Sequence, residues 1–390
     1  MIRREIESEL KRLAKQFKAV AVVGPRQSGK TTLTRYIFKK KPYANLENPD
    51  IRRFALDDPR GFLSQYGSGA VIDEAQRVPE LFSYLQQELD ENSRKGRFIL
   101  TGSNNFLLQE TISQSLAGRI AYLYLLPFTL TELSAGKDTD LAVRIIKGSY
   151  PPVYDQKIDP GKWYPNYIRT YVERDVRQIK NISDLNTFER FVRLCAGRSG
   201  QLLNLSSLAL EVGIDSKTAG AWISVLESSF IVFRLYPWHR NFSKRIVKMP
   251  KLYFYDTGLV CSLLGISNSN QLNTHPLYGS IFENLIISEL KKHCLNRSLN
   301  EDIFFWRDNV GHEVDVIIGS NAGFIPVEIK SGKTITDEFF KGLNYWEKIS
   351  GIQSGAVVYG GEGDQNYSDG RKSISWRKLH MLFKYGSGSA

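Results

Sequence analysis

Cysteine is scarce in this sequence, and long apolar runs are absent. The 390 residues include three cysteines, which are far apart and form no Cys-x-x-Cys pair. This usage argues against a disulfide framework or a structural zinc site and fits a reducing cytoplasm. No uninterrupted apolar run approaches the roughly 18 residues that a membrane span needs. The opening stretch MIRREIESELKRLAKQF is charged and lacks the apolar core of a signal peptide. We therefore expect a cytoplasmic protein without a membrane partner.

The composition is that of a folded and moderately basic protein. Hydrophobic residues make up 42% of the chain and aromatic residues 12%, which is enough to build real cores. Lys and Arg outnumber Asp and Glu by 52 to 41, for a formal charge of +11. This excess favours polyanionic partners, although a solvated surface gives the same numbers. At about 150 residues per domain, the length predicts two or three domains.

Apolar runs and helical stretches alternate up to residue 135. Most of the apolar runs are continuous and rich in β-branched residues, and five of them are strand candidates: KAVAVVG, YANLEN, GAVIDE, RFILTGS and RIAYLYLLPF. Such runs are typical of a parallel sheet that is buried on both faces. Helical stretches such as TTLTRYIFKK and PELFSYLQQEL lie between them. Residues 1–135 are therefore predicted to form a doubly wound α/β domain.

A phosphate-binding loop follows the first of these strands. Gly24, Gly29, Lys30 and Thr31 have the Gly-x-x-x-x-Gly-Lys-Thr spacing, between a strand and a helix. The glycines let backbone N–H groups surround phosphate oxygens, Lys30 reaches the β- and γ-phosphates, and the Thr31 hydroxyl is a ligand for Mg²⁺. The nucleotide-binding residues predicted with them are Pro25, Arg26, Gln27, Ser28 and Thr32. ATP with Mg²⁺ is the expected ligand.

The strand GAVIDE supplies the acids that such a loop needs. Asp73 is predicted to hold Mg²⁺ through water, and Glu74 to act as the general base for the attacking water. Two adjacent acids favour an ATP-hydrolysing enzyme over a nucleotide kinase. The next strand ends in Thr101, Ser103 and Asn104. Ser103 is predicted to sense the γ-phosphate, and a capping role at the start of the next helix is the alternative.

From residue 136 the apolar spacing becomes helical, and residues 136–200 are predicted to form a helical lid or connector. Within residues 201–265, Ser206 and Ser216 are expected to cap two helices joined by a turn at Gly213. The strand candidate FIVFRLYPW follows, which completes the order of a winged helix-turn-helix. The second helix offers only Lys217, Thr218 and Ser224 as polar contacts, so both DNA contact and a packing role remain open.

A basic stretch, HRNFSKRIVKMPK, comes just after that strand candidate. Its charged residues are His239, Arg240, Lys244, Arg245, Lys248 and Lys251. Clusters of this kind commonly bind phosphate backbones without sequence preference. A solvated basic hairpin is the alternative.

A second α/β unit is predicted for residues 276–385, before a linker-like tail at 386–390. Asp315 is followed, after twelve residues, by Glu328-Ile329-Lys330, the arrangement of restriction-endonuclease-like nucleases. The two acids would hold a second Mg²⁺ or Mn²⁺, Lys330 would stabilise transition-state charge, and Glu283 is a candidate third acid. Cutting is not implied, because a fold does not determine an activity.

Taken together, the motifs resemble a large prokaryotic family of AAA+-type ATPases that carry a C-terminal domain of uncharacterised function. The strings that carry the resemblance span nearly the whole chain and include GPRQSGKTT, VIDEAQRVPELF, SLAGRI, YVERDV, EVDVII and PVEIKSG. GSYPP departs from the family, which more often has two glycines there. The resemblance implies ATP hydrolysis at subunit interfaces of a homo-oligomer, with an arginine finger from the neighbour. Arg119 is the candidate for this finger, with a structural ion pair as its alternative, and Arg174 is a second candidate that would reach the γ-phosphate from the lid.

Three hypotheses for the function follow. The first is an ATPase that binds and remodels DNA, including branched DNA, without sequence preference. The second is a nucleotide-controlled signalling or defence switch that acts on a protein partner. The third is an active metal-dependent DNA nuclease.

Overall fold

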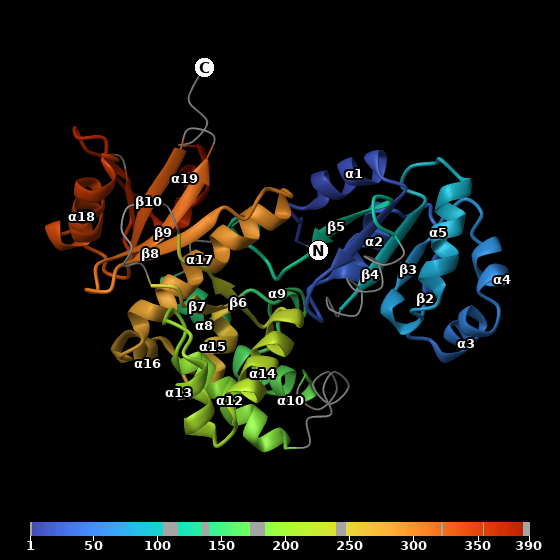
Figure 1. Ribbon diagram of the computed structural model, residues 1–390, viewed down its shortest axis with the longest axis horizontal. Coiled ribbons are helices and arrows are strands. Elements are labelled where there is room, and N and C mark those ends of the chain that lie inside the picture. The colour runs from blue at the N-terminus through green and yellow to red at the C-terminus, as the bar shows by residue number, and fades with distance from the viewer. Residues whose placement is uncertain are drawn as a thin grey trace.

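The structure is a computed structural model that describes residues 2–103, 116–134, 140–171, 184–238, 247–320, 323–353 and 355–384. Two sheets lie at opposite ends of the molecule, with helices between and below them (Figure 1). None of the described helices is both long and apolar enough to cross a membrane.

The N-terminal domain is built on a five-stranded parallel sheet of order β2-β3-β4-β1-β5. Its strands are β1 (Ala19–Val23), β2 (Tyr43–Asn45), β3 (Val71–Asp73), β4 (Phe98–Gly102) and β5 (Ile120–Tyr124). All five strand predictions and the parallel α/β sheet are confirmed. Every residue of β1 and β4 is buried, because helices cover both faces of the sheet.

The helices of this domain divide between the two faces. Leu10, Leu13 and Leu33, from α1 (Glu7–Gln16) and α2 (Lys30–Ile37), pack against Val20 and Val22 of β1. The neighbouring side chains of β1 face the opposite way, toward α3 (Pro49–Asp57), α4 (Pro59–Ser64) and α5 (Leu81–Glu91). Alternation along a strand sends successive side chains to opposite faces, so a continuous apolar run serves both layers.

The middle of the chain is mainly helical. Its described elements are α7 (Leu130–Ser134), α8 (Leu141–Lys147), α9 (Pro151–Asp155), α10 (Pro160–Tyr171), α12 (Leu185–Gly197), α13 (Leu205–Val212), α14 (Ser216–Ser228), β6 (Val232–Leu235), β7 (Lys251–Phe254), α15 (Thr257–Leu263) and α16 (Ser269–Thr274). Strands β6 and β7 pair antiparallel. Most of the basic stretch between them, residues 239–246, lies outside the described residues.

The two predicted helix caps were wrong by one or two residues. Asn204 caps α13 by accepting from the backbone N–H of Ser207, and Asp215 caps α14 by accepting from that of Thr218. An N-cap residue precedes the first helical residue, and its side chain accepts from the backbone N–H of the second or third residue beyond it. Ser206 and Ser216 already lie within helices and cannot do so. Gly213 ends α13 in a left-handed conformation, as the predicted turn requires.

The C-terminal unit contains a six-stranded mixed sheet of order β12-β13-β11-β10-β9-β8. Its elements are α17 (Tyr278–Asn296), β8 (Ile303–Arg307), β9 (Glu313–Ser320), β10 (Gly323–Lys330), α18 (Lys341–Ser350), β11 (Ala356–Tyr359), β12 (Gln365–Asn366), β13 (Lys372–Ser375) and α19 (His380–Lys384). The segment before β11 begins with a 3-10 turn (Asp337–Phe340) and continues as α18. Strands β12 and β13 were not predicted, because both are short and polar.

Helix α17 joins the units. In Figure 1 it lies between the two sheets, and it belongs to a core that continues through all three parts of the chain. Two of its buried charges reach back to the N-terminal domain. Glu289 accepts from the backbone N–H of Leu130 at 2.7 Å, and Lys292 donates to the carbonyl of Phe128 at 3.0 Å. The segment after β5 is therefore held by the C-terminal unit.

Candidate functional site

The phosphate loop connects β1 to α2 at the carboxyl edge of the parallel sheet. A Cβ on Gly24 would lie 2.1 Å from the carbonyl oxygen of Leu125, so only glycine fits there. Gly29 has a φ of 94°, a left-handed conformation that favours glycine. Lys30 is buried and donates from Nζ to the carbonyls of Gly24 and Pro25, at 2.9 and 2.8 Å. The lysine is thus folded back over its own loop.

One buried polar atom of this loop supports anion binding. Ser28 has no exposed surface, and its Oγ has no hydrogen-bond partner among the described residues. Buried hydroxyls are almost always paired, so an unpaired one within a phosphate loop fits a site built to hold phosphate oxygens.

Asp73 ends β3 directly opposite the start of α2. Its Oδ2 accepts from Thr31 Oγ1 at 2.8 Å and from the Tyr43 hydroxyl at 2.6 Å, and its Oδ1 accepts from Thr101. Burial and the bond to Asp73 raise the pKa of Tyr43, which therefore remains a donor. A carboxylate held beside a threonine hydroxyl is a suitable oxygen donor set for Mg²⁺, so the residues present fit this cofactor.

Glu74 stands beside Asp73 in a left-handed conformation, with a φ of 54°. A non-glycine residue in this region is strained, and such strain concentrates at functional sites. The Glu74 carboxylate accepts from Gln76 Nε2 at 2.6 Å and from Ser103 Oγ at 3.1 Å. Ser103 thus orients Glu74, while Asn104 lies outside the described residues.

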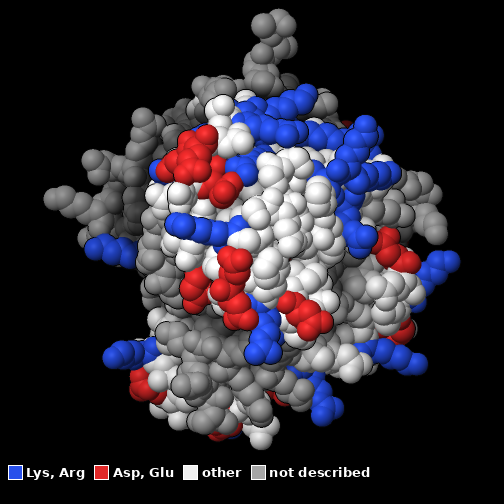
Figure 2. Space-filling model, turned by 90° about the vertical axis from the view of Figure 1, so that its right-hand side faces the viewer, with Lys and Arg blue, Asp and Glu red and all other residues white. Residues whose placement is uncertain are grey.

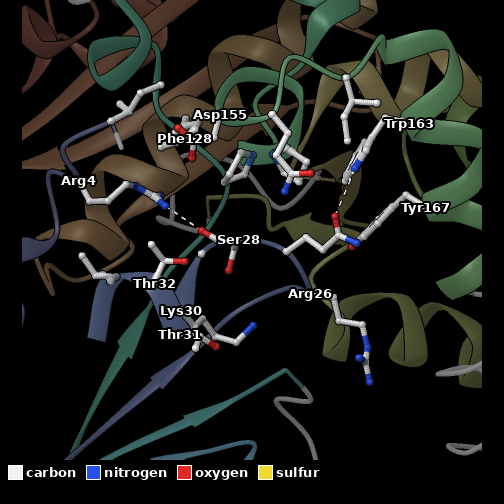
Figure 3. Close-up of a pocket in the computed structure, with 18 of the residues that line it drawn as sticks. Arg4, Arg26, Ser28, Lys30, Thr31, Thr32, Phe128, Asp155, Trp163 and Tyr167 are labelled. Atoms are coloured by element: carbon white, nitrogen blue, oxygen red, sulfur yellow. Dashed lines mark hydrogen bonds between the residues drawn. The ribbon is translucent and has the colours of Figure 1, made fainter. Parts of the chain in front are cut away.

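A cavity of about 800 Å³ extends from the loop toward the helical region (Figure 3). Its lining includes residues that the sequence analysis did not single out, namely Arg4, Phe128, Pro151, Pro152, Asp155, Trp163 and Tyr167. Trp163 stacks on Tyr167 and donates from Nε1 to Gln27 Oε1 at 3.3 Å. The volume suits a nucleotide, with aromatic side chains on one side and the phosphate loop on the other.

Arg4 is the least expected member of this lining. It precedes α1, is 6% exposed, and donates to the carbonyls of Ser28 and Leu126 at 2.8 and 2.6 Å. It also pairs with Glu132 at 3.1 Å. No motif marks Arg4, because only the tertiary fold brings its partners, two backbone carbonyls and the Glu132 carboxylate, together.

Arg119 lies away from this site. It directly precedes β5, at the amino edge of the sheet, and its guanidinium pairs with Asp90 at 2.6 Å on the surface. Within one chain Arg119 is therefore far from the phosphate loop, and its role as a finger stays a prediction about a neighbouring subunit. Arg174, the other candidate, lies outside the described residues.

Of the acids predicted for the C-terminal unit, Glu283 and Asp315 lie close together, and Glu313, which was not predicted, joins them in place of Glu328. Carboxylate oxygens of Glu283, Glu313 and Asp315 lie within 4.8 Å of one another. Lys330 contacts Asp315 at 3.3 Å and Glu328 at 2.5 Å. Burial and then the neighbouring Asp315 raise the pKa of Glu328 well above its usual range.

Lys251 was expected in the exposed basic stretch, and this expectation was wrong. Its side chain is 3% exposed and pairs with Glu283 at 3.0 Å and with Glu313. Burial alone would lower the pKa of Lys251, but Glu283, Tyr253, Glu313 and Asp315 raise it well above its usual range. The ammonium is therefore charged and belongs to the acidic cluster.

Comparison with known proteins divides the chain into three matched segments. Residues 16–134 match an AAA domain, residues 138–270 a domain of unknown function (DUF8612), and residues 278–379 another (DUF4143). The uncharacterized proteins Rv2008c of Mycobacterium tuberculosis and Mb2031c of Mycobacterium bovis are each 31% identical over 365 residues, which are 92% of this chain and 80% of theirs.

Likenesses among solved structures are weaker. The Walker-type ATPase paby2304 of Pyrococcus abyssi is 15% identical, with a TM-score of 0.46 over 67% of this chain and 96% of that chain. A RuvB variant of Thermotoga maritima is 15% identical, with a TM-score of 0.31 over 59% of this chain and 88% of that chain. The sequence matches are the stronger finding. The chain belongs to the family of AAA-type ATPases that includes the uncharacterized protein Rv2008c of Mycobacterium tuberculosis.

Proposed function

We propose that this protein hydrolyses ATP with Mg²⁺ and uses the energy to remodel DNA. One observation carries the first part: Lys30, Thr31, Asp73, Glu74 and Ser103 converge at the carboxyl edge of one sheet. Strands β1 and β3 position the loop and the acids, and β4 lies between them and supplies Thr101 and Ser103.

Each side chain has one task in the proposed mechanism. Lys30 exchanges its two carbonyl partners for phosphate oxygens, and Thr31 and Asp73 would hold Mg²⁺, which neutralises phosphate charge. Thr101 and Tyr43 fix the Asp73 carboxylate. Glu74 accepts a proton from the attacking water, and Ser103 sets its orientation.

Phosphate release and calorimetric nucleotide binding test this mechanism. Lys30→Ala should lose nucleotide binding, because the charge that meets the phosphates is gone. Glu74→Gln should keep binding and lose turnover by a factor of about 100 or more, the usual worth of a general base. Wild-type protein that neither binds nor hydrolyses ATP would refute the proposal. So would a Glu74→Gln variant with full turnover.

The support for DNA as partner is electrostatic. Basic residues gather near the amino ends of strands β1, β2 and β4, and we call them the basic edge. They are Lys18, Lys39, Lys40, Lys41, Arg94 and Lys95. Three of these lysines and Arg94 line a hollow at this edge. Figure 2 shows Lys and Arg gathered across the upper part of this end of the molecule. A hollow ringed by cations suits a phosphate backbone.

Helix α14 is less suited to reading bases. Thr218 Oγ1 already donates to Asp215, and Ser224 Oγ donates to the carbonyl of Gly220. Of the three polar residues expected to contact DNA from this helix, only Lys217 is exposed and has a side chain that none of these hydrogen bonds engages. Binding without sequence preference is therefore the proposal, with the winged helix-turn-helix as a packing module.

DNA titrations distinguish this proposal from a switch that acts on a protein partner. We expect duplex or branched DNA to stimulate ATP hydrolysis and to bind more weakly as salt increases. The double variant Lys39→Ala/Lys40→Ala should bind DNA more weakly at low salt while basal hydrolysis is unchanged. An ATPase rate that is indifferent to every DNA tested, together with a protein retained only with ATP, would favour the switch.

Hydrolysis at subunit interfaces is proposed from the family resemblance, with Arg119 as the finger. Arg119→Ala should then lower turnover by about a thousandfold or more, while nucleotide binding remains. Asp90→Ala removes the partner of Arg119 and serves as the control. If both variants retain full turnover, Arg119 is only a surface ion pair, and such pairs contribute little.

A further inference from the structure

The acidic cluster of the C-terminal unit lies where that unit meets the middle of the chain. Glu283 comes from α17, and Glu313 and Asp315 come from β9. The closeness of their carboxylate oxygens is the arrangement in which a nuclease would hold a divalent ion. Whether such an ion fits depends on the other charges nearby.

A cation from a different unit already occupies the space between these acids. Lys251 is the first residue of β7, and its Nζ contacts Glu283 Oε1 at 3.0 Å and also pairs with Glu313. Tyr253, two residues along the same strand and so on the same face, donates to the same Glu283 oxygen at 2.5 Å. Two successive side chains on this face of β7 thus point into the cluster.

The position of β7 is fixed by its backbone. The register pairs Lys251 with Leu235 of β6. The N–H of Phe254 donates to Asn284 Oδ1 at 2.7 Å, and Asn284 Nδ2 returns a bond to the carbonyl of Phe254 at 2.9 Å. Asn284 is the neighbour of Glu283 on α17, so these bonds hold the far end of β7 against the helix turn that carries Glu283.

The remaining acids are also paired. Arg307 contacts Glu313 at 2.8 Å, and Lys330 contacts both Asp315 and Glu328. Each of the four carboxylates therefore has at least one cationic partner. A divalent ion bound to Glu283 and Glu313 would meet the ammonium of Lys251 at close range in a site with little solvent to screen the repulsion. With Lys251 in place, the residues present do not fit a second metal ion between Glu283 and Glu313.

We propose that Lys251 is the resident cation of this cluster and excludes divalent metal while β7 stays packed on α17. The cluster is then an ion-pair clasp between the two units and not the centre of a metal-dependent nuclease. This assignment is independent of the ATPase site, which lies on a different sheet. Metal could enter only if Lys251 withdrew, and withdrawal would break the clasp.

Manganese titration of the full chain without nucleotide tests the clasp, with bound Mn²⁺ measured by electron paramagnetic resonance. Wild-type protein should show no Mn²⁺ site that depends on Glu283. Lys251→Met should create one, since Glu283 and Glu313 then lack the cation that they share, and the added change Glu283→Gln should remove it again. Lys251→Arg retains a cation and should exclude Mn²⁺ as wild type does.

Lys248→Met is the matched control, because Lys248 is exposed and lies three residues before the cluster lysine. It should leave Mn²⁺ binding unchanged. A Mn²⁺ site in wild-type protein that is lost on Glu283→Gln or Asp315→Asn would overturn the assignment. The same holds if Lys251→Met folds, by its circular dichroism, and still binds no Mn²⁺.

Discussion

Gly24 lies so close to the backbone of Leu125 that the nucleotide loop has no room for a side chain at this position. The carbonyl of Leu125 lies where a Cβ would be, so Gly24→Ala must displace either the loop or the end of β5. We expect kcat/KM for ATP to fall about 100-fold, as for other small misplacements of catalytic groups. Gly67→Ala is the control, since its nearest neighbour would be 3.8 Å away. Equal kinetics for the two variants would contradict this reading.

His293 on α17 makes stability depend on pH. Its ring stacks on Phe383, and burial, Arg297 and His380 lower its pKa to about 3. In the unfolded chain the imidazole takes up a proton near pH 6.5, so between these values the unfolded state binds more protons. The contribution of His293 is therefore complete above about pH 6.5 and is lost as the pH falls toward 3.

This dependence can be measured from melting temperatures at pH 7 and pH 5. The decrease on acidification should be smaller in His293→Phe, which keeps the stacking and has nothing to protonate. An unchanged decrease in the variant would assign the acid sensitivity to other groups.

Helix α13 depends on its cap more than on the serines that follow. Asn204→Ala removes the acceptor for the Ser207 N–H and should cost about 1 kcal/mol, which corresponds to roughly fivefold faster amide exchange within α13. Ser206→Ala, inside the same helix, should change exchange by less than twofold. Hydrogen exchange read by mass spectrometry distinguishes the two. If Ser206→Ala speeds amide exchange more than Asn204→Ala does, Ser206 is the cap after all.

The strand predictions succeeded where the sequence has a clear apolar run. Most of the five strands of the first sheet come from continuous apolar runs, and all five exist. The short polar strands β12 and β13 were missed, because their composition does not mark them: β13 is a strand through its pairing with β11, and β12 through its pairing with β13. The caps were placed one or two residues late, since a Ser stands one or two residues after each true cap, Asn204 and Asp215, and only the backbone shows which residue precedes the helix.

At the level of the whole molecule, α17 connects the nucleotide cavity to the acidic cluster. Its first turns carry Glu283, and its later turns carry Glu289 and Lys292, which hold the segment containing Phe128. Lys292→Met would leave the buried Glu289 without its partner at 2.8 Å. We expect a loss of about 3–5 kcal/mol of stability, typical of a broken buried pair, and a higher KM for ATP.

Thermal unfolding and ATPase kinetics check this expectation. Lys291→Met is the matched control, because Lys291 pairs with Glu301, whose side chain is 40% exposed, and such a pair contributes at most about 1 kcal/mol. A Lys292→Met variant as stable as this control would show that Glu289 finds other partners. A normal KM despite lower stability would show that the Phe128 segment holds its position without the lysine.

The sequence by itself determined the phosphate loop, the two acids of β3 and the parallel sheet around them. These features depend on local spacing and on apolar runs, and both are properties of neighbouring residues. Only the tertiary structure decided that Arg4 supports the loop, that Lys251 leaves the basic stretch for the acidic cluster, and that α17 spans both sites. Such contacts join residues tens to more than a hundred positions apart, so they depend on which surfaces meet when the units pack, and no local pattern records that.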